Sequence, residues 1–256
     1  MTFLDAVILG AVEGITEFLP ISSTGHLILA SHLLSLPSSS FLTSFVIAIQ
    51  LGAIGAVVVL YWRSFLNLEI LKRLLTGFVP TAVIGLSLYS LVKHVLLGNE
   101  LVVVIALAVG GGALIIFEFF HKESSEAVGG VTTITYKQAF LIGIAQSVAI
   151  IPGVSRSAAT IVGGLMLGIR RTTIVEFSFL LAVPTMGAAV ALDVLKNYQT
   201  FTLQNASTIG VGFTAAFIVA LIAIKFLLRF VRSSTFIPFG IYRIVIAGLF
   251  FWLVLS

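Results

Sequence analysis

Six long apolar runs constrain this chain more than any other feature. A transmembrane helix needs about 20 consecutive, mostly apolar residues. Runs of this order occupy residues 41–62, 77–97, 101–120, 176–196, 208–230 and 237–254. Only 9% of the residues are charged and 59% are hydrophobic, which leaves too few charges for the surface of a soluble domain. The sequence therefore predicts an all-α integral membrane protein that crosses the membrane several times.

Shorter apolar runs form two pairs, each around a polar interruption. Residues 3–19 and 24–36 flank the first interruption, and residues 138–151 and 157–169 flank the second. The shorter member of each pair is too short to cross a bilayer alone. Each pair is therefore either one broken span or a re-entrant hairpin whose polar tip lies at membrane depth.

The two halves of the chain resemble each other in the order and spacing of their polar and small residues. The matched positions are Gly10, Glu13, Ser22 and Thr24 with Gly143, Gln146, Ser155 and Ser157. Interrupted short segments at matching places in two halves are typical of inverted-topology repeats with a midplane site. We predict a first repeat at 1–120 with a re-entrant hairpin at 3–36, a cytoplasmic linker at 121–135, and a second repeat at 136–256 with a hairpin at 136–169.

Lysine and arginine, which are enriched in cytoplasmic loops, favour hairpins over broken spans. With hairpins, one side of the membrane collects Arg63, Lys72, Arg73, Lys122, Lys137, Arg170, Arg171, Lys225, Arg229 and Arg232, and the other side only Lys93 and Lys196. Both termini and the open end of the first hairpin are then non-cytoplasmic. Arg156 and Arg243 stay within the membrane, where we expect Arg243 to snorkel toward the interface.

The first interruption, E-G-I-T-E-F-L-P-I-S-S-T-G-H at 13–26, concentrates polar groups in an apolar chain, which favours a functional site. Glu13 and Glu17 are four residues apart and share one face of a helix. The hydroxyl residues at 22–24 follow the break, where a new helix begins. The start of that helix directs unpaired N–H groups and a partial positive charge toward the tip.

The second interruption, P-G-V-S-R-S at 152–157, adds a guanidinium to a second helix start. Two helix N-termini, Arg156 and several hydroxyls predict an anion site, with phosphate as the natural ligand. The carboxylates of Glu13 and Glu17 suit Mg²⁺ or Ca²⁺ bridging to phosphate oxygens. The alternatives are that Arg156 and the glutamates form only a buried ion pair, and that the hydroxyls are only helix caps.

Both motifs resemble the signature regions of the bacterial undecaprenyl-diphosphate phosphatases, the bacitracin-resistance type. The likeness continues in F-V-I-A-I-Q-L-G at 45–52, Y-K-Q-A-F at 136–140, E-F-S-F-L-L-A-V-P at 176–184 and F-I-P-F-G-I-Y-R at 236–243. Ala158 departs from the family, which usually has Gly there. The resemblance implies hydrolysis of undecaprenyl diphosphate to undecaprenyl phosphate and phosphate, recycling the lipid carrier of cell-wall synthesis in the bacterial inner (plasma) membrane.

The resemblance also implies roles for individual residues. By this likeness Glu13 and Glu17 would bind the metal, Arg156 would hold the diphosphate, and Ser23 and His26 would belong to the catalytic group. From their places at the two tips we add Glu17 and Ser22 to the catalytic group, and Thr24, Ser155 and Ser157 to the diphosphate-binding group. The nucleophile is left open between Ser23, activated by His26, and His26 itself, with Ser22 and water as further candidates.

A second class of function shares these features. Inverted repeats with broken helices that meet at the midplane are common in transporters, so a lipid-phosphate flippase or transporter is the alternative. The expected partners are the lipid substrate and the membrane, with a second copy of the chain as a candidate partner in a homodimer. No nucleic-acid partner is expected.

Overall fold

The computed structural model describes residues 1–88, 90, 96, 99–123, 127, 129–197 and 206–255, and every regular element among these residues is a helix, without a β-strand. Within this described part of the chain, six helices are long and apolar enough to cross a membrane. They are α3 (Ser40–Leu60), α4 (Leu68–Ser87), α6 (Glu100–Phe120), α9 (Arg171–Asn197), α10 (Ala206–Phe230) and α11 (Ile237–Phe250), the last prolonged by a π-helical turn at Phe251–Leu255. The prediction of an all-α, multi-pass membrane protein is confirmed.

The second span begins earlier than the apolar run at 77–97 indicated. Helix α4 starts at Leu68 because the Asn67 side chain accepts a hydrogen bond from the backbone N–H of Glu69 and caps the helix. Its first turns carry charges, and Glu69 forms ion pairs with Lys72 and Arg73. A search for apolar runs passes over such a charged first turn. The last part of the predicted run lies mostly outside the described residues.

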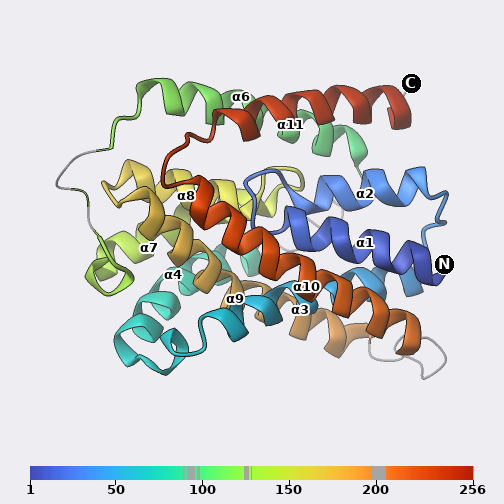
Figure 1. Ribbon diagram of the computed structural model, residues 1–256, viewed down its shortest axis with the longest axis horizontal. Coiled ribbons are helices and arrows are strands. Elements are labelled where there is room, and N and C mark those ends of the chain that lie inside the picture. Colours follow the sequence, from blue (N-terminus) through green and yellow to red (C-terminus); the bar gives the residue numbers. More distant parts are fainter. Residues whose placement is uncertain are drawn as a thin grey trace.

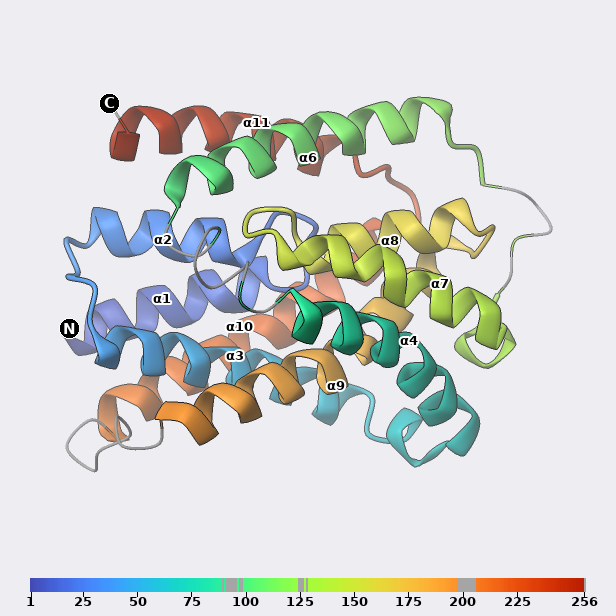
Figure 2. The same ribbon diagram turned by 180° about the vertical axis from the view of Figure 1, so that it is seen from behind.

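The four shorter helices form two hairpins. They are α1 (Phe3–Thr16) with α2 (Ser23–Leu33), and α7 (Tyr136–Ser147) with α8 (Arg156–Met166). The hairpins enter the molecule from opposite ends, and their tips meet near its middle (Figures 1 and 2). Both chain termini lie at the end from which the first hairpin enters (Figure 1). The re-entrant position of the tips in a membrane stays a prediction.

The helices pack in pairs that match between the halves. Helix α1 packs on α10 as α7 packs on α4, and α3 packs on α10 as α9 packs on α4. The remaining large contacts, α6 with α11 and α3 with α9, join equivalent helices of the two halves. Exchanging the halves reproduces these contacts, as a duplicated unit would require, whereas the smaller contacts of α8 with α9 and of α1 with α3 have no equivalent of similar size. The pattern supports the predicted repeat, while its inverted membrane topology stays a prediction.

Glycines let each hairpin approach its neighbouring span closely. A Cβ atom on Gly10 of α1 would overlap the carbonyl oxygen of Gly212 on α10. A Cβ atom on Gly143 of α7 would likewise overlap the carbonyl oxygen of Gly77 on α4. Small residues allow this backbone approach between helices in a membrane, where packing contributes most of the association energy. These contacts hold the first helix of each hairpin, and so fix where each tip lies.

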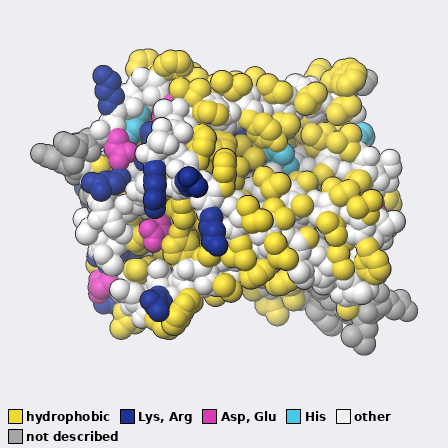
Figure 3. All heavy atoms as spheres, viewed as in Figure 1, with side chains coloured by type: hydrophobic (Ala, Val, Ile, Leu, Met, Phe, Trp, Pro, Cys, Tyr) yellow, Lys and Arg dark blue, Asp and Glu magenta, His cyan; other side chains and the backbone are white. Residues whose placement is uncertain are grey.

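Charge is distributed unevenly along the molecule. On the face seen in Figure 3, Lys and Arg gather at the end where Figure 1 shows the connection from α6 to α7. Apolar side chains cover most of the remaining face, and the termini lie at the opposite end. This arrangement is the one that the loop charges predicted, because cytoplasmic loops attract Lys and Arg.

Candidate functional site

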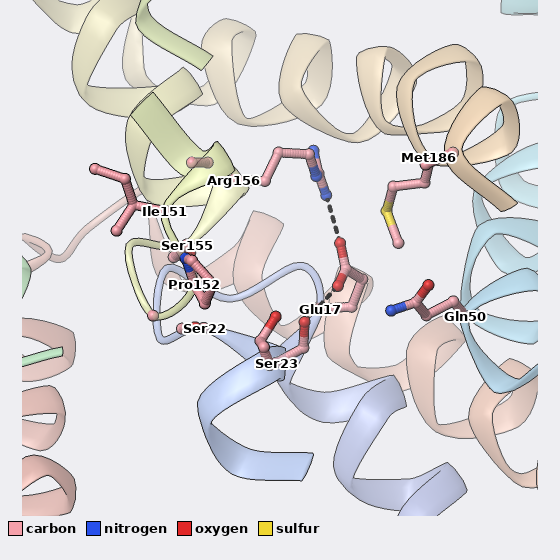
Figure 4. A pocket seen from close by; sticks show the side chains of 13 residues that line it. Glu17, Ser22, Ser23, Gln50, Ile151, Pro152, Ser155, Arg156 and Met186 are labelled. Carbon is pink, nitrogen blue, oxygen red and sulfur yellow. Dashed lines mark hydrogen bonds and ion pairs between the residues drawn. The ribbon is translucent and has the colours of Figure 1, made fainter. Parts of the chain in front are cut away.

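A cavity of about 220 Å³ lies where the two hairpin tips meet (Figure 4). Its polar lining comes from both tips and from α3, and consists of Glu17, Ser22, Ser23, Thr24, Gln50, Ser155 and Arg156. Met186 and Ala189 of α9 close one apolar side. Residues more than a hundred positions apart in the sequence therefore share one wall, as the two interruptions predicted.

Glu17 is the centre of the polar contacts in this cavity. Its Oε2 accepts a hydrogen bond from Ser23 Oγ at 2.6 Å, and its Oε1 forms an ion pair with Arg156 Nη2 at 3.1 Å. Glu17 is only 7% exposed. Arg156 Nη1 donates in addition to the backbone oxygen of Ser178 on α9 at 2.8 Å. One buried carboxylate thus connects a hydroxyl of the first tip with the guanidinium of the second (Figure 4).

Both tips end in a serine with unusual backbone geometry. Ser22 has φ 73° and Ser155 has φ 77°, and each is the N-cap of the following helix. Positive φ in a residue other than glycine is uncommon and concentrates at functional sites. The turns place the N-termini of α2 and α8 beside the cavity, with their unpaired N–H groups and partial positive charge. Helix N-termini and a guanidinium are groups that favour an anion, so the predicted anion site stays a prediction that this geometry supports.

The other predicted ligands of the diphosphate differ in how they are held. Thr24 is exposed to the cavity, and Ser155 Oγ accepts from the backbone N–H of Ala158 at 3.2 Å as a helix cap. Ser157 is fully buried, and its hydroxyl donates to the Phe18 carbonyl at 2.7 Å. That bond joins the second tip to the first. Ser157 is therefore not brought to the cavity in this arrangement.

Glu13 lies one helical turn before Glu17 and is completely buried. Neither of its carboxylate oxygens has a hydrogen-bond partner. Buried polar atoms without partners are rare and point to a missing ligand or ion. Two neighbouring carboxylates fit a hard divalent cation, although no cluster of three or more His, Asp or Glu occurs in the described part of the chain. Substrate and water oxygens would have to supply the other ligands.

His26 is buried, and both of its ring nitrogens have partners other than Ser23. Nδ1 lies 2.7 Å from the Ser22 carbonyl oxygen, and Nε2 lies 2.9 Å from the hydroxyl of Tyr242 on α11. The two rings are stacked, with centroids 5.5 Å apart. Ser23 Oγ donates to Glu17 instead. The structure therefore does not bring the predicted base His26 into contact with Ser23, and the role of His26 stays a prediction.

The expectation that Arg243 snorkels to the interface is wrong. Arg243 is fully buried, and its guanidinium turns inward to backbone carbonyl groups of both tips and of α6. The acceptors are Pro20 at 3.4 Å, Gly153 at 3.0 Å, Val154 at 2.9 Å, Ala106 at 3.0 Å and Leu107 at 3.4 Å. Gly110 provides the space for this guanidinium, because a Cβ atom at that position would overlap it. The charge is satisfied inside the protein and needs no route to water.

Sequence reasoning also assigned no role to Gln50, which lines the cavity, or to Tyr242, which contacts His26. The sequence did contain a signal that the last helix contributes to the interior of the protein. Arg243 is an ionisable residue in an apolar span, and such residues point to a functional interior by default. Its neighbour Tyr242 would have followed from the same argument.

The fold and the cavity define a multi-pass helical membrane protein with a polar cavity between two hairpin tips. The chain belongs to the family described as bacitracin resistance protein BacA, whose profile matches residues 6–249. The predicted family is thereby confirmed.

Curated relatives match the chain along nearly its whole length. A protein of Sulfurihydrogenibium sp. is 52% identical over 98% of this chain and 99% of the relative. A protein of Persephonella marina is 48% identical over 100% of both chains, and one of Aquifex aeolicus is 49% identical over 96% of both. Each of these relatives is named undecaprenyl-diphosphatase.

Proposed function

We propose that this protein is an undecaprenyl-diphosphatase, which hydrolyses undecaprenyl diphosphate to undecaprenyl phosphate and phosphate and so recycles the lipid carrier of cell-wall synthesis. The observation that carries the proposal is the contact of Ser23 and Arg156 with one buried carboxylate, Glu17, between two helix N-termini. Relatives about half identical to this chain have the name of that activity.

In the proposed reaction, Arg156 and the N-termini of α2 and α8 hold the diphosphate. Ser23 Oγ attacks the terminal phosphorus and passes its proton to Glu17 Oε2, which lies 2.6 Å away. The P–O bond to the lipid phosphate breaks, the leaving phosphate oxygen takes the proton from Glu17, and undecaprenyl phosphate leaves. Water then hydrolyses the phosphoserine and releases phosphate. Glu17, again deprotonated, takes a proton from the attacking water and returns it to Ser23 Oγ as the bond from that oxygen to phosphorus breaks.

We include a divalent cation, Mg²⁺ or Ca²⁺, held by Glu13 and Glu17. The support from the chain is the donor set: Glu13 has two buried oxygens without a hydrogen-bond partner, next to the carboxylate that contacts Ser23. A cation bound there would polarise a phosphoryl oxygen and offset the charge that develops during transfer. Glu13 and Glu17 would then share the cation, while Glu17 also serves as the base for Ser23 and pairs with Arg156.

Purified wild-type protein in detergent is expected to release phosphate from a polyprenyl diphosphate, and a chelator should stop the release until Mg²⁺ or Ca²⁺ is restored. Ser23→Ala should lower kcat by about 10³-fold or more, because it removes the attacking oxygen. Ser87→Ala is the matched control, since Ser87 is an exposed serine on α4. A folded wild-type protein without any release would contradict the proposal and favour the flippase or transporter alternative, which the names of the relatives do not favour.

We further propose that the protein lies in the bacterial plasma membrane with its termini and the opening of the first hairpin on the non-cytoplasmic side. The support is the gathering of Lys and Arg at the end opposite the termini.

Because the chain has no cysteine, single cysteines can test this orientation. Ser38→Cys, exposed between α2 and α3, should react with an impermeant thiol reagent added to intact cells. Lys122→Cys, exposed after α6, should react only after the membrane is opened. The reverse pattern would contradict the proposed orientation.

A further inference from the structure

We infer that Tyr242 and His26 form a positioning pair that holds the first hairpin tip, so that His26 acts through the backbone of Ser22 and not on the substrate. The inference rests on the proposed function, because it concerns how Ser23 is placed for the attack on phosphorus. It assigns a role to Tyr242 and replaces the predicted role of His26 as base or nucleophile.

The hydrogen bonds of His26 define the tautomer of its ring. Nδ1 lies 2.7 Å from the Ser22 carbonyl oxygen, and a carbonyl oxygen can only accept, so Nδ1 carries the proton. In the neutral ring Nε2 then has the lone pair, and the Tyr242 hydroxyl at 2.9 Å donates to it. The one basic lone pair of His26 is therefore occupied by Tyr242. It is not available to accept the proton of Ser23, which is directed to Glu17.

The tip needs this support because of its own geometry. Ser22 has φ 73°, and its side chain makes no capping hydrogen bond to α2. The equivalent Ser155 has a similar φ of 77°, but its hydroxyl caps α8 through Ala158. In the first tip, the His26 N–H to the Ser22 carbonyl supplies the restraint that a side-chain cap supplies in the second. Ser23 follows Ser22 directly, so the backbone at Ser22 decides where Ser23 Oγ lies.

Helix α11 brings two consecutive residues to this tip. Tyr242 stacks on His26 with an angle of 5° between the rings, and Arg243 donates to the Pro20 carbonyl. Tyr242 is 41% exposed, whereas His26 is buried. The exposed partner can therefore be changed with little disturbance of the core. Tyr242 acts on Ser23 only through His26 and Ser22, which makes it a positioning residue.

Two substitutions at His26 separate positioning from catalysis. His26→Asn retains an N–H near the place of Nδ1 that can still donate to the Ser22 carbonyl, but it has no basic nitrogen. His26→Ala has neither. We expect His26→Ala to lower kcat by about 100-fold with little change in KM. The kcat of His26→Asn should be at least about tenfold higher than that of His26→Ala, an effect within the range of one restored hydrogen bond. If His26→Asn is as inactive as His26→Ala, His26 is the base or nucleophile and the inference is wrong.

Tyr242→Phe retains the stacked ring and removes only the hydroxyl. We expect kcat to fall by about 3- to 10-fold, the effect of one neutral hydrogen bond, with KM nearly unchanged. In the His26→Asn background the same change should have no further effect, because its partner nitrogen is absent. The matched control is Tyr136→Phe, whose hydroxyl bonds Glu69 at the other end of the molecule, and which should retain the wild-type rate.

A wild-type rate in Tyr242→Phe, or equal losses in both backgrounds, would overturn the inference. Melting temperatures in detergent show whether a variant is folded, so that a loss of kcat is not mistaken for unfolding. These comparisons use active wild-type enzyme as their reference. Absence of activity in wild-type protein would therefore refute the proposed function, whereas an unexpected pattern among the variants would refute only this inference.

Discussion

Glu17→Gln is expected to lower kcat for phosphate release by about 10³-fold or more, near the upper range for loss of a general base. The amide can still accept a hydrogen bond from Ser23, but it cannot take the proton, and it no longer offsets the charge of Arg156. Phosphate release in detergent, followed at saturating substrate, measures the effect. Glu69→Gln is the matched control, because Glu69 is exposed and pairs only with residues at the far end of the molecule.

The same substitution leaves the Arg156 guanidinium without its buried carboxylate. Breaking a buried ion pair by removing one partner costs about 3–5 kcal/mol, so the melting temperature should also fall. The two effects can be separated, because a folded fraction can be measured and its activity expressed per folded molecule. If kcat per folded molecule stays within tenfold of wild type, Glu17 is not the base, and the contact with Arg156 is only structural.

The spans could be predicted because their signal is local. An apolar run of sufficient length is helical in a membrane whatever its neighbours are, which is why α3 and α6 follow from composition alone. The start of α4 could not be predicted in this way, because its charged residues Glu69 and Arg73 are stabilised by pairing with each other. A window that scores each residue separately counts those charges only as a cost.

The residue types of the candidate site could be predicted from the sequence, but the contacts between those residues could not. Carboxylates at one break and an arginine at the other indicated an anion site, and the structure brings Glu17 and Arg156 to 3.1 Å. Which hydroxyl contacts which carboxylate depends on how the hairpins dock, and the sequence carries no local signal for that. Arg243 shows the same limit. Snorkelling is the favourable choice for an arginine in a single span, but the docked tips offer it carbonyl groups instead.

Equivalent polar residues of the two halves differ in their hydrogen bonding, and this difference favours unequal roles for the two hairpins. Gln146, the counterpart of Glu13, is buried and donates to the hydroxyls of Thr81 at 2.9 Å and Thr185 at 3.2 Å. Glu13 has no such partners. A neutral, fully bonded amide stabilises the second hairpin, whereas a buried carboxylate without partners costs stability. Such a cost is understandable if Glu13 binds a cation during function.

Arg156→Lys is expected to lower kcat/KM by about 100-fold, although the positive charge is retained. The guanidinium uses one nitrogen for Glu17 and another for the Ser178 carbonyl, and its planar fork can hold phosphate oxygens in two places. An ammonium is a single point charge and cannot bridge these partners at once. Arg156→Ala should be worse, since it also leaves Glu17 unpaired. Arg63→Lys, exposed and stacked on Trp62, is the control and should keep the wild-type rate.

The kinetic parameter that changes will show where Arg156 acts. If it binds the diphosphate equally in the ground state and the transition state, KM rises and kcat is unchanged in Arg156→Lys. If it contacts charge that develops only during transfer, kcat falls in proportion to kcat/KM. Because Arg156 also holds the carboxylate that contacts Ser23, we expect the fall to lie mostly in kcat. Wild-type kcat and KM in Arg156→Lys would show that charge alone suffices, and would contradict a role for the guanidinium geometry.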